Sequence, residues 1–249
     1  MRDRIFQIVE NEFSSLIEKI QSDFITNFKA KQHNFLLKEL DPLMSAHMVF
    51  VSSFESKSGN SIQKVAKEVA KLRYGAENVP QIVNPHQLEH NVQNPNEHEQ
   101  IIVSNVDMNN PELQGKIAEF MTRCEGDSRK KVCCSVNHES ILELLDGELP
   151  ISNEIHTKPV DLAFWDGDEL NIMEIKAGGN LDSSNAPSNA KKLLTIYTGL
   201  NYRKTKPYFA TIYHKDGEGR TWSGSIKKYL QYPHMFLVGS AFWNKILPE

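Results

Sequence analysis

Residues 159–179 read PVDLAFWDGDELNIMEIKAGG, two apolar runs on either side of a polar turn at residues 166–169. Apolar runs separated by a short turn rich in Asp and Gly predict a β-hairpin. Because side chains alternate between faces along a strand, Glu174 and Lys176 point to one face and the apolar residues beside them to the other. Apolar residues on both faces predict a central strand that protein covers on each side.

The charged end of this hairpin is where we expect chemistry. Asp161 opens the first strand and lies across from Glu174 near the end of the second. Two neighbouring carboxylates raise each other's pKa unless a cation sits between them, and Mg²⁺ prefers such oxygen ligands. The backbone carbonyl of Ile175 is a third candidate ligand. Lys176 is placed to orient or deprotonate a water that attacks a phosphodiester. The alternative is a surface salt bridge across a hairpin, which stabilises little.

Length and composition indicate an ordinary globular protein. The chain has 249 residues, of which 39% are hydrophobic and 24% charged, enough for one full domain with an appended helical arm. It contains no apolar run of the roughly 18 residues that span a bilayer, and its first residues lack a signal-peptide core. We therefore expect a cytoplasmic protein with no membrane partner.

The three cysteines, Cys124, Cys133 and Cys134, do not indicate a disulfide framework, because their number is odd and two are adjacent. His138 lies nearby, but the spacing is not the C-x-x-C pattern of zinc sites. Reduced structural thiols are the better interpretation.

Charge is distributed unevenly along the chain. Residues 186–249 hold ten Lys or Arg and three acids, a net +7, and because the whole chain carries −4, the first 185 residues carry −11. A polyanion, if one is bound, is expected on this C-terminal quarter. A solvated basic surface is the alternative.

Periodicity predicts the remaining elements. An amphipathic stripe over residues 2–40 predicts a helical arm that packs on its own domain or on a second subunit. Residues 57–75 predict a helix with Ser61 as N-cap and Gly75 at its end. The other expected elements are a loop over 84–100, a strand over 100–108, a helix capped by Asn110 with Pro111 in its first turn, a helix over 186–203, a strand over 207–214, and a strand followed by a helical turn over 235–246. This order predicts an α/β (α+β) fold, a small mixed sheet flanked by helices.

The motif residues carry a resemblance to a known superfamily. Pro159-Val160-Asp161 resembles a P-D element with one residue inserted, and Glu174-Ile175-Lys176 resembles (D/E)-x-K, so the chain is similar to the PD-(D/E)xK nucleases. Within them it looks most like type II restriction endonucleases, in particular TdeIII-like enzymes. That resemblance rests on SGNSIQKVAKEVA, on KAGGNLDSSNAPSNAKKLL directly after the motif, and on the closing LVGSAFWNKI, and it covers about residues 50–249.

The resemblance implies a restriction-endonuclease-like αβββαβ core, within a nuclease domain over residues 46–249 that follows an N-terminal arm over residues 1–45. It also implies one or two Mg²⁺ ions per active site and hydrolysis that leaves 5′-phosphate and 3′-hydroxyl ends. Asp161 and Glu174 would bind the metal, and Lys176 would position the attacking water.

Superfamily members often have a fourth active-site residue on the first core helix. Gln63 is favoured here because it borders the buried face of its helix, and related enzymes tolerate Gln at this place. Glu68 and Glu55 are the alternatives.

Several residues after the motif are candidates for DNA binding. Asp182, Ser183 and Asn185 lie in a glycine-rich polar stretch and could cap a helix whose N-terminus faces the DNA backbone, although capping alone would explain them. Basic residues that follow are candidates for phosphate contacts: Lys191, Lys192, Arg203 and Lys204.

Together these features predict a Mg²⁺-dependent type II restriction endonuclease that cuts double-stranded DNA at a specific short sequence. A homodimer is expected, because cutting both strands of a symmetric site needs two active sites. A cognate DNA methyltransferase is expected in the same restriction-modification system, though not as a bound partner. The alternatives are a repair or junction-resolving nuclease of the same fold and a non-catalytic DNA-binding module.

Overall fold

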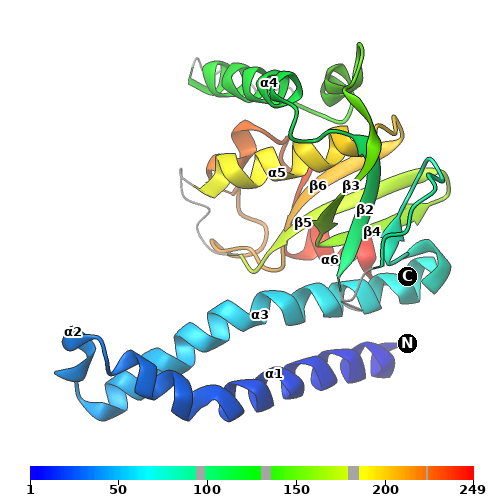
Figure 1. The fold of residues 1–249 in the computed structure, drawn as a ribbon. Coiled ribbons are helices and arrows are strands. Elements are labelled where there is room, and N and C mark those ends of the chain that lie inside the picture. The colour runs from blue at the N-terminus through cyan, green and yellow to red at the C-terminus, as the bar shows by residue number, and fades with distance from the viewer. Residues whose placement is uncertain (94–98, 130–135, 179–184, 223) are drawn as a thin grey trace. The chain divides into compact units, whose positions relative to one another are not determined.

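The computed structural model describes residues 1–93, 99–129, 136–178, 185–222 and 224–249 (Figure 1). They form two compact units, residues Met1–Val69 and Ala70–Glu249. The predicted division into an arm over 1–45 and a nuclease domain over 46–249 stays a prediction.

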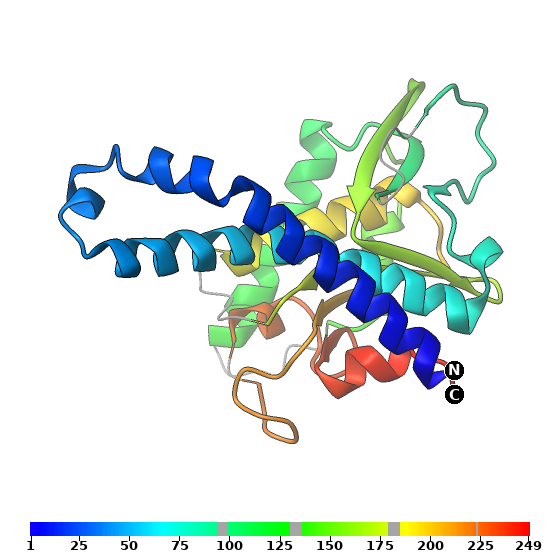
Figure 2. The same cartoon turned by 90° about the horizontal axis from the view of Figure 1, so that it is seen from below.

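The first unit is built from helices. α1 (Arg2–Lys31) is followed by the short α2 (Phe35–Lys38) and by α3 (Pro42–Tyr74), which continues into the second unit. Figure 2 shows α1 and α3 as the two arms of a helical hairpin with α2 at its turn. Lys57 of α3 lies 2.5 Å from Asp23 of α1, an exposed ion pair that links the two arms. The helix expected over residues 2–40 is thus confirmed for its greater part.

The predicted start of the second helix is wrong. Ser61 lies inside α3, and the N-cap is Asp41, whose Oδ1 accepts hydrogen bonds from the amides of Leu43 and Met44 at 2.9 and 3.3 Å. An Asp before Pro42 is itself a helix-start signal, because Pro suits the first helical position. The helix does end directly before Gly75, which has a positive φ of 90°.

The second unit contains two mixed sheets. The first sheet has the order β1 (Ile82–Val83), β2 (Gln100–Val106), β3 (Ile151–Val160), and the second has the order β4 (Leu162–Asp166), β5 (Glu169–Lys176), β6 (Thr205–Thr211), β7 (Phe236–Val238). β3 runs antiparallel to β2, and β4 antiparallel to β5, while β6 and β7 continue in parallel. The chain order α3, β2, β3 with β4, β5, α5, β6 agrees with the expected α+β class and its αβββαβ order.

The quoted hairpin forms as predicted, but the strand before it was not predicted. β3 and β4 are separated only by Asp161, where the chain bends and changes its pairing partner from β2 to β5. Much of β3 is exposed, so its sequence lacks the apolar alternation that marks a half-buried strand.

Helices cover the sheets of the second unit. α4 (Pro111–Arg129) has the predicted cap, since Asn110 Oδ1 accepts from the amide of Glu112 at 2.9 Å. α5 (Asn185–Leu200) lies against β2, β5 and β6 and beneath α4, and α6 (Ser240–Ile246) lies beside β7 (Figure 1). Short 3₁₀ helices occupy Ala76–Asn78, Ser140–Leu145 and Ser225–Lys228. Residues 84–93 of the predicted loop contain no helix or strand.

A buried glutamine joins the two sheets next to the bend. Gln100, 1% exposed, belongs to β2, and its side-chain amide pairs with the backbone of Ala163 in β4. Its Nε2 donates to the Ala163 carbonyl at 2.8 Å and to the Pro80 carbonyl at 2.6 Å, while Oε1 accepts from the Ala163 amide at 2.8 Å. The side chain therefore replaces a backbone pair where the chain passes from β3 of the first sheet to β4 of the second, and it fixes the chain two residues after Asp161.

Candidate active site

Strand register brings the two motif carboxylates together. Leu162 pairs with Met173, so Asp161 reaches the level of Glu174 on the neighbouring strand. The amide of Ile175 donates to Asp161 Oδ2 at 2.8 Å. The predicted convergence of Asp161 and Glu174 is therefore seen in the structure.

Two lysines face these carboxylates. Lys176 Nζ donates to Glu174 Oε1 at 2.8 Å. Lys192, which comes from α5, places its Nζ 2.5 Å from Glu174 Oε2 and 3.4 Å from Asp161 Oδ1. Lys192 thus forms an ion pair with each of the two carboxylates.

Burial determines the electrostatics of the group. The side chains of Glu174 and Asp161 are only 1% and 10% exposed, whereas those of both lysines are 38% exposed. Burial, and then the charge of Glu174, raise the pKa of Asp161 above its ordinary value. Burial alone would lower the pKa of Lys192, but the charges of Asp161 and Glu174 outweigh it and raise that pKa.

The chain turns sharply directly after the motif. Gly178 has a φ of +135°, and a Cβ at this position would lie 2.7 Å from the ring of Tyr213. Glycine is therefore favoured here for its conformation, because side chains rarely adopt this positive φ. The predicted DNA-binding residues Asp182 and Ser183 lie outside the described residues.

The other predicted DNA-binding residues are spread over the second unit. Lys191 is exposed on α5, and Asn185 is the first residue of that helix. Arg203 pairs with Asp146 at 3.1 Å, and Lys204 pairs with Asp168. Lys192 differs from these because it reaches the carboxylates, which its expected role in phosphate binding did not suggest.

The candidates for a fourth active-site residue lie in the first unit. Gln63, Glu68 and Glu55 are all residues of α3 before Ala70. The choice of Gln63 stays a prediction.

Sequence reasoning missed the part of Lys192 at the carboxylates and the part of Gln100 behind Asp161. A Lys-Lys pair in the helix after the motif was visible, but only the packing of α5 against β5 shows which lysine reaches the carboxylates. Among the described residues, no group of three or more His, Cys, Asp or Glu side chains surrounds a candidate metal position. No helix in the described ranges is long and apolar enough to cross a membrane.

A family model described as "Type II restriction endonuclease, HinfI" matches residues 1–249. The chain belongs to this HinfI family. It is therefore a type II restriction endonuclease, a hydrolase, and the family implies double-stranded DNA as its substrate. No curated protein and no solved structure was found to match the chain.

The match confirms the predicted enzyme class at the level of the restriction endonuclease. It gives no support to the finer placement among TdeIII-like enzymes, and membership of the PD-(D/E)xK superfamily stays a prediction from the motif. For a member of the HinfI family, the trio Asp161, Glu174 and Lys176 is the natural candidate for the catalytic centre.

Proposed function

We propose that this HinfI-family chain hydrolyses double-stranded DNA at a specific short sequence with Mg²⁺, through Asp161, Glu174 and Lys176. The observation that carries the proposal is the pair of buried carboxylates that share one cation, the Lys192 ammonium, with a second lysine beside them. A hairpin with a purely structural role would not need this arrangement, because a buried ion pair contributes little to the net stability of the fold.

The residues at this position fit a hard divalent cation. Both carboxylates already face one positive charge, and their oxygens are the ligands that Mg²⁺ takes. The N–H and C=O of a residue in a strand face the same neighbour, and the Ile175 amide faces Asp161. Its carbonyl is therefore available on the same side as a third ligand. When bound, Mg²⁺ would offset charge on the phosphate and make water more acidic.

The chain's own residues have separate tasks in this mechanism. Asp161 and Glu174 would hold the metal, and Lys176, whose Nζ donates to Glu174 Oε1, would orient the attacking water. The water oxygen forms a bond to phosphorus and gives up a proton to the surrounding water, while the bond from phosphorus to the 3′ oxygen breaks and that oxygen takes up a proton from the surrounding water, which leaves 5′-phosphate and 3′-hydroxyl ends. The Lys176 ammonium also offsets the negative charge that grows on the phosphate.

Basic residues of the second unit are proposed to hold the DNA backbone, although Arg203 and Lys204 lie at the end of the sheet away from Lys176. Lys191 is exposed on α5, close in sequence to Lys192, and Arg203 and Lys204 extend the basic segment. Their partners Asp146 and Asp168 are exposed acids, and exposed ion pairs are readily exchanged for a phosphate. Asp182, Ser183 and Asn185 stay predicted DNA-binding residues from the sequence.

The metal dependence has a direct test. Incubation of plasmid DNA with the protein and Mg²⁺ is expected to give discrete bands, and EDTA should abolish them because the two carboxylates then lack the metal ion that acidifies water and offsets the phosphate charge. Sequencing of the fragment ends gives the recognition site and the cut position. A smear, or bands that persist in EDTA, would contradict the proposal. Preference for branched over linear DNA would favour a junction-resolving nuclease, and a salt-sensitive gel shift without cleavage a binding module.

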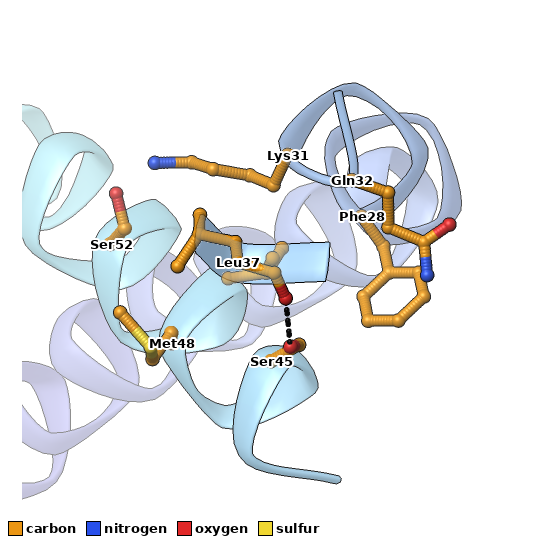
Figure 3. A pocket seen from close by; sticks show the side chains of 8 residues that line it. Phe28, Lys31, Gln32, Leu37, Ser45, Met48 and Ser52 are labelled. Carbon is orange, nitrogen blue, oxygen red and sulfur yellow. Dashed lines mark hydrogen bonds between the residues drawn. The ribbon is translucent and has the colours of Figure 1, made fainter. Parts of the chain in front are cut away.

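A homodimer is part of the proposal, and the first unit supplies the surface. Phe35, Leu43 and Met44, at the turn of the helical hairpin, are 77%, 65% and 56% exposed. An apolar hollow in the same hairpin is lined in part by Phe28, Leu37 and Met48, and at its wall Ser45 donates to the Leu37 carbonyl at 3.2 Å (Figure 3). Exposed apolar groups that are contiguous mark interaction surfaces, and a second copy would cover them.

Met44→Asp is expected to weaken dimerisation by about tenfold or more, because it would bury an unpaired carboxylate in the interface. Asn11→Asp, which adds the same charge at an exposed position of α1, is the control. Sedimentation equilibrium of both variants gives the dissociation constants. Equal constants for Met44→Asp and the unsubstituted protein would exclude this surface.

A further inference from the structure

The four oxygens of the two motif carboxylates have three partners between them. Asp161 Oδ2 accepts from the Ile175 amide, and Glu174 Oε1 accepts from Lys176, so each carboxylate has one oxygen bound within the hairpin. The remaining oxygens, Asp161 Oδ1 and Glu174 Oε2, both face Lys192 Nζ. A single ammonium thus occupies the one position that both carboxylates share.

Lys192 differs from Lys176 in how it reaches this position. Lys176 lies on β5, two residues after Glu174, and its place is fixed by the strand. Lys192 extends from α5, and its side chain is 38% exposed, so its ammonium can leave the carboxylates for solvent by rotation of the side chain alone. Lys191 on the same helix is exposed.

We propose that Lys192 is the internal counter-cation of the metal-free protein: its ammonium occupies the position between Asp161 and Glu174 and leaves when a divalent cation binds. This inference rests on the proposed magnesium-dependent function. Two like charges cannot share one small site, because their repulsion at a few ångströms is large where water is largely excluded. The lysine therefore keeps two buried carboxylates together before the metal arrives, and it competes with the metal. Once displaced, the ammonium is free to pair with a phosphate of the DNA.

The test is metal binding without DNA, so that no turnover enters the measurement. Mn²⁺ is titrated into the unsubstituted protein, Lys192→Met and Lys191→Met, and free Mn²⁺ is followed by electron paramagnetic resonance. Lys192→Met keeps the aliphatic stem but removes the competing charge, and it is expected to bind Mn²⁺ about tenfold more tightly. Lys191→Met should bind as the unsubstituted protein does.

Thermal unfolding gives a second readout that needs no metal. In EDTA, Lys192→Met is expected to melt about 5 °C or more below the unsubstituted protein, because its buried carboxylates have lost a cation. Mn²⁺ should raise its melting temperature more than it raises that of the unsubstituted protein. Lys191→Met should show neither effect.

The outcomes separate this inference from the proposed function. If the unsubstituted protein binds Mn²⁺ and Lys192→Met binds it equally or more weakly, Lys192 does not compete with the metal. That result would overturn the inference and leave the magnesium-dependent function unaffected. Absence of Mn²⁺ binding in both proteins would overturn both proposals. A Lys192→Met chain that folds only with Mn²⁺ supports the inference, and one that stays unfolded with Mn²⁺ counts against it, because the metal should replace the lost charge.

Discussion

Lys176→Ala is expected to lower the rate of DNA cleavage by about a thousandfold or more, with little change in the folded structure. The side chain holds one oxygen of Glu174 and is proposed to orient the attacking water and to offset charge on the phosphate. Its removal leaves Asp161 and Glu174 with Lys192, so the carboxylates keep a cation. The loss should therefore appear in the chemical step and not in stability.

The measurement is single-turnover cleavage of a short duplex with excess protein and saturating Mg²⁺. Lys191→Ala is the matched control, since it removes the same side chain from an exposed position of α5. Loss of one phosphate contact should weaken DNA binding without lowering the rate in the bound complex. A Lys176→Ala rate within about tenfold of the unsubstituted rate would contradict the assignment.

The presence of two lysines at the carboxylates makes this comparison informative. If Lys192 and not Lys176 served the attacking water, Lys176→Ala would remain active and Lys192→Met would not cleave even when fully loaded with metal. Under the roles proposed here, Lys176→Ala loses the chemical step and metal-loaded Lys192→Met keeps it, because Lys192 has left the carboxylates before the water attacks. The two lysines can thus be distinguished: loss of Lys176 lowers the cleavage rate, and loss of Lys192 raises the affinity for the metal.

Local sequence signals explain why the hairpin could be predicted. A turn at residues 166–169 between apolar runs fixes the pairing of β4 with β5, and this register alone brings Asp161 to the level of Glu174. Asn110 before Pro111 is equally local, and it caps α4 as predicted. Such features depend on residues within one turn or one hairpin.

Features that depend on packing between distant segments were not predictable. α3 continues through Gly59 from its cap at Asp41, so a helix start predicted at Ser61 was wrong. β3 pairs with β2 although much of its surface is exposed, and its pattern therefore gives no strand signal. Lys192 was expected to bind phosphate, and only the position of α5 against β5 brings it to Glu174.

Gln100→Leu is expected to lower the free energy of unfolding by about 3–5 kcal/mol, because each unsatisfied buried polar group costs about 1–3 kcal/mol. The leucine would fill a similar volume, but the amide and carbonyl of the fully buried Ala163 would lose their partners. The Pro80 carbonyl would lose a donor as well. Denaturant unfolding curves measure the change, and Gln7→Leu at an exposed position of α1 should stay within about 0.5 kcal/mol of the unsubstituted protein.

The same substitution should also lower activity in the protein that remains folded, by a route different from that of Lys176→Ala. Gln100 fixes Ala163, two residues beyond the bend at Asp161, so a loosened β4 would move the carboxylate away from the Ile175 amide and from Glu174. Metal affinity and rate should therefore fall together, whereas Lys176→Ala lowers the rate alone. A Gln100→Leu protein with a stability loss below about 1 kcal/mol would show that water or a backbone shift replaces the glutamine, and that the bend at Asp161 holds without it.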